Sequence, residues 1–435
     1  MDRLPITSWH RRAVVVVGLG LFFEIYEVFL AGVLSGVLSH RFHLGKSEVS
    51  MLLASAFFGM FLGALAFGPI TDRLGRRFGF LLSLSVYSVF SLVGAFSVGP
   101  VMLVATRFLA GLGIGAAPPI ADCYLADLLP ANGRGRYTAW AYTLSFGGVP
   151  LAGFLGRWLV PRAPFGFEGW RWMFAVGALG AVVVFALRAA LPESPRWLES
   201  VGRVREAEAI VERLELQAGA DLLPEPDVRA PAPDQPGRRR QLLMPPYRRR
   251  TLMMMAFHLL QTWGYYGFGT LAPMVLKAKG FDIPETLLFS AMTFLGYPIG
   301  SALSVPVMER FERKHLVVGA AAGMAALGLG FGLATSTGPI VVCGLGYTLV
   351  SNIFSNTFHV YQAEIFPTQL RATAVGSAYS LSRLSSGLMP FVLVPLLHTR
   401  GPDALFAAVA TALAIVAVDI GMFGPRTTGR ALDGV

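Results

Sequence analysis

The sequence predicts an all-α integral membrane protein, with twelve membrane-spanning helices arranged as two pseudo-symmetric lobes of six. Its 435 residues are 54% hydrophobic and only 14% charged, with a mean hydropathy of +0.58. Apolar segments long enough to cross a bilayer as helices follow one another between polar loops. The two halves of the chain also share sequence features at a fixed spacing, which indicates an internal repeat.

Each apolar segment is a predicted helix, taken here in chain order. The first is too long for the apolar core of a signal peptide and has no small-residue cleavage site, so we expect it to be retained. Six spans precede a long polar segment and six follow it. The predicted spans are residues 13–38, 48–70, 77–98, 101–127, 137–160, 170–191, 251–276, 285–308, 315–336, 338–362, 370–396 and 402–424.

The basic residues are concentrated in alternate loops. The formal net charge of +10 therefore reflects membrane topology and does not indicate a nucleic-acid partner. By the positive-inside rule, these loops and both termini are expected in the cytoplasm, with the chain in the inner membrane. The other loops, such as 97–100 and 335–338, carry little charge. The basic loop residues include Arg11, Arg12, Arg73, Arg76, Arg77, Arg134, Arg136, Arg310, Arg313, Lys314, Arg426 and Arg430.

The segment 192–250 divides the chain into three parts. It starts with a stretch of amphipathic helical spacing and continues into "LLPEPDVRAPAPDQPG", which is typical of a linker. We therefore predict an N-terminal lobe over 1–191, a cytoplasmic linker with short helices over 192–250, and a C-terminal lobe over 251–435.

The internal repeat has an offset of 237 residues. "YLADLLPANGR" (124–134) returns as "YQAEIFPTQLR" (361–371). Two lobes of the same orientation predict a transporter that rocks about a site between them. The same offset aligns Glu24 with Gln261, Asp122 with His359, and Tyr142 with Tyr379.

A charged motif lies between the second and third spans. "GPITDRLGRR" (68–77) combines glycines, which allow close helix approach, with Asp72, which can meet a helix N-terminus or an arginine. The motif resembles the signature of the major facilitator superfamily, and "RFLAGLGIGAAPP" (107–119) resembles that family's second signature. The resemblance implies the two-lobed fold and alternating access.

Three further motifs narrow the resemblance. "ADLLPANGRGR", "AEIFPTQLRATA" and "PESPRWL" are similar to those of sugar porters, organic-ion transporters and bacterial metabolite–proton symporters. By this resemblance, charged residues at the cytoplasmic face are expected to make salt bridges that break and reform during transport, although a static network would use the same residues. The expected gating residues are Asp72, Arg73, Arg76, Asp127, Arg134, Glu193, Arg196, Glu364 and Arg371.

Two acids interrupt the first span. Glu24 and Glu27 lie in "FEIYEVFLAG", which is similar to the Asp-Gly-Tyr-Asp pattern of metabolite and aromatic-acid proton symporters. A charge at mid-membrane costs roughly 2.5–3.5 kcal/mol, so each acid needs a partner, a wet cavity or a proton. Low polarity and a neighbouring like charge favour a neutral carboxyl, so the pair is expected to hold a proton near neutral pH.

Arg383 supplies a positive charge in the eleventh span. Its motif, "SRLSSGLMP", resembles the organic-ion branch, in which anion carriers have an arginine here. A buried guanidinium is stabilised by a substrate carboxylate through charge-assisted hydrogen bonds. A permanent bridge to Glu24 or Glu27 is the alternative.

Polar side chains recur at helical spacing on the spans that line the cavity in this superfamily. Asp122 and His359 lie closer to the cytoplasm, as a second titrating pair or an inner gate, and a purely structural histidine is the alternative. The residues expected to couple protons are Glu24, Glu27, Asp122 and His359. Those expected to bind substrate are Arg383, Tyr379, Gln261, Tyr265, Asn352, Asn356 and Trp263.

These features predict a proton-coupled symporter of a small organic anion, with an aromatic or heterocyclic carboxylate as the expected class. We expect a monomer that uses the proton as coupling ion and no cofactor or metal. A sugar or polyol symporter and an exporter are the alternatives within transport. A receptor or a membrane enzyme is disfavoured, because no metal-ligand cluster, nucleophile motif or phosphate loop stands out. Cys123 and Cys343 fall within spans, and no disulfide is expected.

Overall fold

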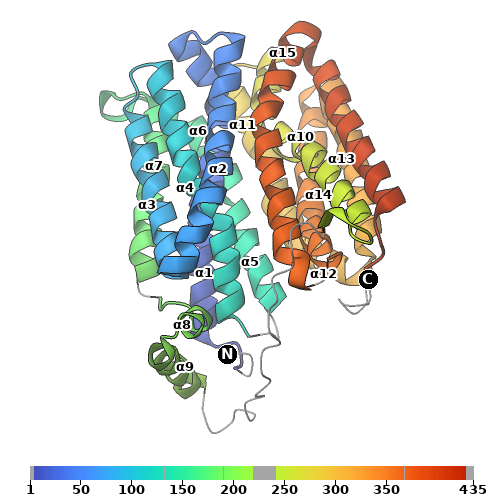
Figure 1. The fold of residues 1–435 in the computed structure, drawn as a ribbon. Coiled ribbons are helices and arrows are strands. Elements are labelled where there is room, and N and C mark those ends of the chain that lie inside the picture. The colour runs from blue at the N-terminus through green and yellow to red at the C-terminus, as the bar shows by residue number, and fades with distance from the viewer. Residues whose placement is uncertain (1–3, 131–133, 190, 219–241, 367, 428–435) are drawn as a thin grey trace.

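The computed structural model describes residues 4–130, 134–189, 191–218, 242–366 and 368–427. The described chain is helical and forms two bundles side by side, which we call the N-lobe (α1 to α7) and the C-lobe (α10 to α15) (Figure 1). The elements are α1 (Ser8–Phe42), α2 (Lys46–Leu74), α3 (Arg76–Ala95), α4 (Pro100–Leu128), α5 (Arg134–Phe146), α6 (Gly148–Leu159), η1 (Pro164–Gly166), α7 (Gly169–Ala189), α8 (Pro195–Ser200), α9 (Val204–Ala218), α10 (Arg248–Ala278), α11 (Ile283–Phe294), α12 (Gly296–Arg310), α13 (Arg313–Leu333), α14 (Thr337–Glu364) and α15 (Thr368–Phe423).

The helices account for the twelve predicted crossings. Within the described residues, nine helical segments are long and apolar enough to span a bilayer by those two criteria. One of them, in α15, contains two crossings that are separated at Gly401, whose φ is +84°. Two further crossings complete the set: α10, and α5 with α6, which are divided at Gly147. The predicted all-α membrane fold is therefore confirmed.

The two ends of the bundle differ in what they carry. α1 starts, and α15 ends, at the end where α8 and α9 also lie (Figure 1). We call this end the termini face and the opposite end the distal face. α8 and α9 pack together through a small apolar cluster of Trp197, Leu198 and Ala207, so the linker helices form a separate platform against the N-lobe.

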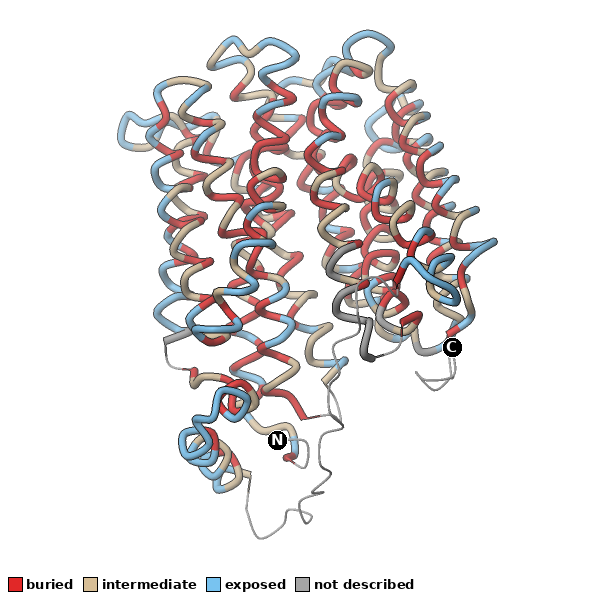
Figure 2. Tube along the Cα trace, viewed as in Figure 1, coloured by how far each residue is buried: buried red, intermediate tan, exposed pale blue. Residues whose placement is uncertain are grey.

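Burial follows the bundle geometry. Buried residues lie within each lobe and along the interface between the lobes, and exposed residues lie mainly on the outside (Figure 2). Many exposed side chains are nevertheless large and apolar: Leu179, Val182 and Val183 on α7 are 57–59% exposed. An apolar outer surface of this kind matches a hydrocarbon surrounding rather than water.

The lobes contact each other along their distal halves. Gly32 on α1 lies so close to the backbone of Thr270 on α10 that a Cβ atom there would clash with it. The Ser50 hydroxyl donates to the Pro390 carbonyl over 3.1 Å, which links α2 to α15. These contacts hold the two lobes together at the distal face.

Candidate functional site

Arg383 on α15 is a buried cation held by two neutral phenols. Its side chain is only 3% exposed. Nη1 donates to the Tyr266 hydroxyl over 2.7 Å, and Nη2 donates to the Tyr379 hydroxyl. The guanidinium carbon lies 5.3 Å and 4.8 Å from the centroids of these two rings. Nε has no hydrogen-bond partner among the described residues, so the donors of Arg383 are not fully used.

Glu24 on α1 is the buried acid of the opposite lobe that interacts electrostatically with Arg383. It is 1% exposed, and its Oε2 atom has no hydrogen-bond partner in the described chain. The charged side chains that act on this carboxylate are Arg383 and, with opposite effect, Asp122. A buried acid without hydrogen-bonded compensation is costly in its ionised form, so Glu24 is a natural place for a transferable proton.

Glu27 does not share this environment, because its carboxylate is paired with Arg107 inside the N-lobe. Its Oε2 pairs with Arg107 Nη1 on α4 at 2.7 Å, and its Oε1 accepts from the Ser91 hydroxyl at 2.5 Å. Arg107 Nη2 also donates to the Glu27 carbonyl at 2.6 Å. Both ionic side chains are at most 1% exposed. The physical reason is that a buried Arg107 requires a counter-charge, and Glu27 provides it inside the N-lobe.

Asp122 on α4 lies at the interface with a solvent-exposed side chain. Its Oδ1 accepts from the hydroxyl of Tyr142 on α5 at 2.6 Å. Tyr142 interacts electrostatically with Glu24 and with Tyr379, and Tyr379 also interacts with Asp122. Asp122 and Tyr142 therefore lie beside the Arg383 site. Asp122 is therefore the accessible acid of the site, whereas Glu24 is the buried one.

His359 on α14 belongs to a hydrogen-bonded chain within the C-lobe. Gln362 Nε2 donates to His359 Nδ1 over 3.2 Å, and Gln362 Oε1 accepts from His258 Nε2 over 2.9 Å. The His359 ring is exposed and stacks on Phe358 at 4.3 Å. Asp122 and His359 are thus each hydrogen-bonded to a residue of their own lobe.

Two predicted substrate ligands bind each other. The Tyr265 hydroxyl donates to Asn352 Oδ1 over 3.0 Å, and Asn352 Nδ2 donates to the Tyr297 carbonyl over 2.5 Å. All three side chains are buried. In this conformation, Tyr265 and Asn352 stabilise the packing of α10, α12 and α14.

Asn356 is also engaged by protein groups. Its Nδ2 donates to the Ser304 hydroxyl over 2.7 Å and to the Ser301 hydroxyl over 3.1 Å. Ser301 in turn shares a 3.1 Å hydrogen bond with Thr143 on α5. Asn356 therefore supports a polar contact between the lobes.

Gln261 and Trp263 on α10 differ in their availability. Gln261 is 3% exposed, and its Oε1 has no hydrogen-bond partner among the described residues. A buried acceptor of this kind can serve a donor group on a ligand. Trp263 is half-buried and packs against the hydrophobic core.

Aromatic rings close the space on the distal side of Arg383. Tyr266 makes an edge contact with Phe57 on α2, with ring centroids 5.2 Å apart, and lies 6.3 Å from Phe29 on α1. Phe29 also lies 6.3 Å from Phe294 on α11. The three phenylalanines are at most 2% exposed. We call Phe29, Phe57, Tyr266 and Phe294 the distal seal. On the termini side, by contrast, Asp122 and His359 are exposed, so the site opens toward the termini face.

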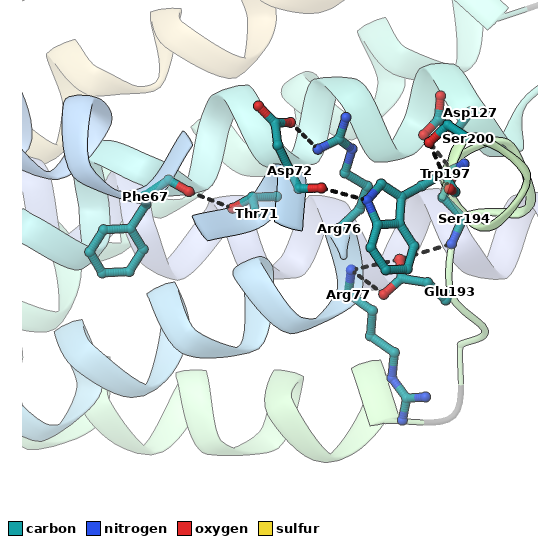
Figure 3. A network of polar contacts seen from close by, with 10 residues as sticks. All are labelled: Phe67, Thr71, Asp72, Arg76, Arg77, Asp127, Glu193, Ser194, Trp197 and Ser200. Atoms are coloured by element: carbon teal, nitrogen blue, oxygen red, sulfur yellow. Dashed lines mark hydrogen bonds and ion pairs between the residues drawn. The ribbon is translucent and has the colours of Figure 1, made fainter. Parts of the chain in front are cut away.

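Four of the predicted gating residues lie at the termini face of the N-lobe: Asp72, Arg76, Asp127 and Glu193 (Figure 3). Glu193 accepts from the Arg77 backbone N–H at 2.9 and 3.1 Å, and so caps the N-terminus of α3. Gly75, with φ +107°, makes the turn before α3, and a Cβ atom there would clash with the Glu193 carboxylate. The helix cap predicted for Asp72 is therefore provided by Glu193.

Asp72 takes the other predicted role and pairs with an arginine. Its carboxylate lies 2.5 Å from Arg76 Nη1, and its carbonyl accepts from the Trp197 indole over 2.9 Å (Figure 3). Asp127 at the end of α4 accepts from the Ser194 hydroxyl over 2.6 Å. α8 thus connects the ends of α2 and α4.

The remaining gating candidates are distributed over both lobes. Arg134 donates to the Leu129 carbonyl over 3.0 and 3.1 Å. Arg73 is exposed and Arg196 is half-buried at the start of α8. In the C-lobe, Glu364 pairs with Arg313 at 2.9 Å. The side chain of Arg371 lies outside the described residues.

Several residues of the site were not among those predicted from sequence. Tyr266, Tyr142 and Gln362 bind Arg383, Asp122 and His359, respectively. The repeat offset gave a signal for Tyr142, because it aligns this residue with Tyr379. For Arg107 the signal was its depth in a span, since an intramembrane arginine demands an acid.

The chain is similar to known membrane transporters in both sequence and fold. A family model described as "Sugar (and other) transporter" matches residues 13–435. Among solved structures, the chain is similar to the xylose transporter XylE of E. coli in a partially occluded inward-open conformation. The TM-score is 0.80 at 20% identity, with 98% of this chain and 100% of that chain covered.

Two curated relatives are named as transporters of niacin and of gentisate. The niacin transporter NiaP of Acinetobacter baylyi is 27% identical over 436 residues, covering 100% of this chain and 98% of the relative. The gentisate transporter of Corynebacterium glutamicum is 26% identical over 392 residues, covering 88% of this chain and 80% of the relative.

Proposed function

Because this chain belongs to the sugar (and other) transporter family of the major facilitator superfamily, and is a multi-pass membrane transporter of small molecules, we propose that it is a proton-coupled symporter of a small organic anion. The expected substrate is an aromatic or heterocyclic carboxylate. The protein is placed in a bacterial inner membrane, and the loop charges favour an orientation in which the termini face is on the cytoplasmic side.

The observation that carries this proposal is that the positive charge of Arg383 is buried and incompletely compensated. The guanidinium is buried, its hydrogen bonds go to neutral phenols, and Nε has no partner among the described residues. Burying a charge with incomplete compensation is unfavourable, and a carboxylate relieves it through bidentate hydrogen bonds. The Tyr266 and Tyr379 rings beside the guanidinium suit a flat aromatic substrate.

Proton coupling follows from the electrostatic link between Arg383 and Glu24. A substrate carboxylate that binds Arg383 takes up the positive charge that would otherwise stabilise an ionised Glu24. Proton and anion therefore favour each other's binding, and the effect is reciprocal. Asp122, which is exposed toward the termini face, is positioned to exchange protons with the cytoplasm. Inward movement of one proton through 100 mV supplies about 2.3 kcal/mol in addition to the pH gradient.

Conformational gating by the charged motifs is part of the proposal. In this conformation the distal seal is closed, and Asp122 and His359 are exposed on the other side. A switch to the opposite conformation brings the termini halves of the lobes together. The charged residues of the network in Figure 3, with Glu364 and Arg313 in the C-lobe, are positioned to exchange partners during this movement.

Uptake by proteoliposomes tests the proposal. Radiolabelled nicotinate and gentisate are offered under an inwardly directed pH gradient, with and without a protonophore, and xylose represents the neutral-sugar alternative. We expect accumulation of an aromatic acid that the protonophore abolishes and that Arg383→Ala lacks. Accumulation of xylose alone, or full anion uptake by Arg383→Ala, contradicts the proposal. Anion uptake that is insensitive to the protonophore rejects proton coupling.

A further inference from the structure

We propose that Tyr266 is a positioning residue that couples the occupancy of Arg383 to the distal seal. The inference rests on the proposed function, because it takes Arg383 as the anion site. It concerns how a bound anion changes the contact between the lobes, which neither the fold nor the anion site by itself specifies.

Tyr266 is the residue that connects the two structures. Its hydroxyl accepts the hydrogen bond from Arg383 Nη1 at 2.7 Å. Its ring packs on Phe57 and lies near Phe29, which both belong to the N-lobe. One side chain of the C-lobe therefore contacts the buried cation with its polar end and the opposite lobe with its apolar body.

The internal repeat separates these two roles. The 237-residue offset aligns Phe29 with Tyr266 and Phe57 with Phe294, so the distal seal consists of two aligned pairs. The contact between Phe29 and Phe294, at 6.3 Å, is the symmetric counterpart of the contact between Tyr266 and Phe57, at 5.2 Å. A phenylalanine thus suffices for sealing in the N-lobe copy.

The hydroxyl of Tyr266 is therefore an addition specific to the C-lobe. The position that the offset aligns with Arg383 is Phe146, so the N-lobe copy has neither the cation nor the hydroxyl. The C-lobe copy has both, and they are hydrogen-bonded to each other. This co-occurrence indicates that the hydroxyl serves Arg383 and that sealing does not require it.

A bound carboxylate competes with the phenol for the guanidinium. Charge-assisted hydrogen bonds to a carboxylate are roughly twice as strong as those between neutral groups, and their fork geometry sets the orientation of the guanidinium. When the anion binds, Arg383 turns toward it and its bond to Tyr266 weakens. The Tyr266 ring is then no longer held against Phe57, and the distal seal opens more readily. With Arg383 empty, the hydroxyl keeps the ring in place.

This coupling has a kinetic consequence. A loaded carrier changes conformation faster than an empty one, so exchange of external for internal anion is faster than net uptake. Tyr266→Phe keeps the ring and removes the tether. Its KM for the anion is expected to fall by about tenfold, because the competing hydrogen bond to a charged group is lost. Its ratio of exchange to net uptake is expected to fall toward one.

Matched variants isolate the effect in proteoliposomes with labelled nicotinate or gentisate. Tyr379→Phe removes the other hydroxyl group that is bonded to Arg383. The Tyr379 ring lies near the C-lobe rings of His258 and His359. This variant is therefore expected to lower KM without changing the ratio of exchange to net uptake. Phe57→Leu removes the N-lobe ring beneath Tyr266; it is expected to lower the ratio without changing KM. Phe57→Leu also tests the coupling if Tyr266→Phe folds poorly in a thermal unfolding assay.

The outcomes separate this inference from the proposed function. An unchanged or raised KM in Tyr266→Phe overturns the competition, and an unchanged ratio in Tyr266→Phe or Phe57→Leu overturns the coupling. A ratio of exchange to net uptake of one in the wild-type protein also overturns the coupling. If the wild-type protein transports no anion, or Arg383→Ala transports it fully, the proposed function fails instead.

Discussion

Arg383 on α15 and Glu24 on α1 are opposite charges that interact across the interface between the lobes, and each retains a buried polar atom with no hydrogen-bond partner among the described residues. The relationship differs from that of Glu27 and Arg107, which satisfy each other within one lobe at 2.7 Å. A pair across the interface is open to a substrate or a proton, whereas a closed pair within a lobe is not. We propose a role in transport for the first pair and a structural role for the second.

Stability measurements distinguish the two glutamates. Removing one partner of a buried ion pair leaves an uncompensated charge and costs about 3–5 kcal/mol. Glu27→Gln is therefore expected to lower the thermal unfolding temperature of the purified protein markedly. Glu24→Gln is the matched control and is expected to leave that temperature unchanged or raise it. Equal losses in the two variants contradict the structural role given to Glu27.

The turn before α3 provides a second test. Gly75 has a φ of +107°, and a Cβ atom there overlaps the Glu193 carboxylate that caps α3. Gly75→Ala is expected to destabilise the protein by about 1–3 kcal/mol through backbone strain. Gly68→Ala, in the same motif, is the control: nothing lies within 4 Å of its added methyl group. A circular-dichroism melt compares the two variants, and equal melting temperatures count against the cap.

Cys123 reports the direction in which the site opens. It lies next to Asp122, is exposed, and is not in a disulfide. In a Cys343→Ala background, a membrane-impermeant maleimide is expected to label Cys123 in inside-out vesicles and to spare it in intact cells. A saturating anion is expected to slow labelling. Labelling of intact cells by the impermeant reagent contradicts the orientation proposed for the termini face.

Much of the fold could be predicted from the sequence, because the thickness of a bilayer requires long apolar helices. The loop charges then indicate the orientation of these helices, and the internal repeat divides them into two lobes. The polarity of α10 was also visible: His258, Gln261 and Thr262 interrupt its apolar character, and α10 is absent from the segments that qualify as spans by hydropathy in the described chain. These polar residues belong to the helix that carries Tyr265 and Tyr266 toward the site.

The different environments of Glu24 and Glu27 could not be predicted from the sequence. Three residues along an α-helix leave about 60° between side chains, and that angle suffices to direct one acid to the lobe interface and the other to Arg107. Which acid faces which neighbour depends on how α1 is rotated against α4. The same holds for Glu193, which caps a helix that starts 117 residues earlier, at Arg76. Such contacts arise from tertiary packing and have no local pattern.

Glu24→Gln tests the central claim most directly, because glutamine imitates a permanently protonated acid of the same shape. In proteoliposomes, wild-type protein and variant are compared for nicotinate or gentisate exchange at equal pH and for accumulation under a pH gradient. Our account predicts that the variant retains exchange through Arg383 and loses accumulation driven by the gradient. Accumulation at the wild-type level would contradict it, since the coupling proton would then have to bind elsewhere.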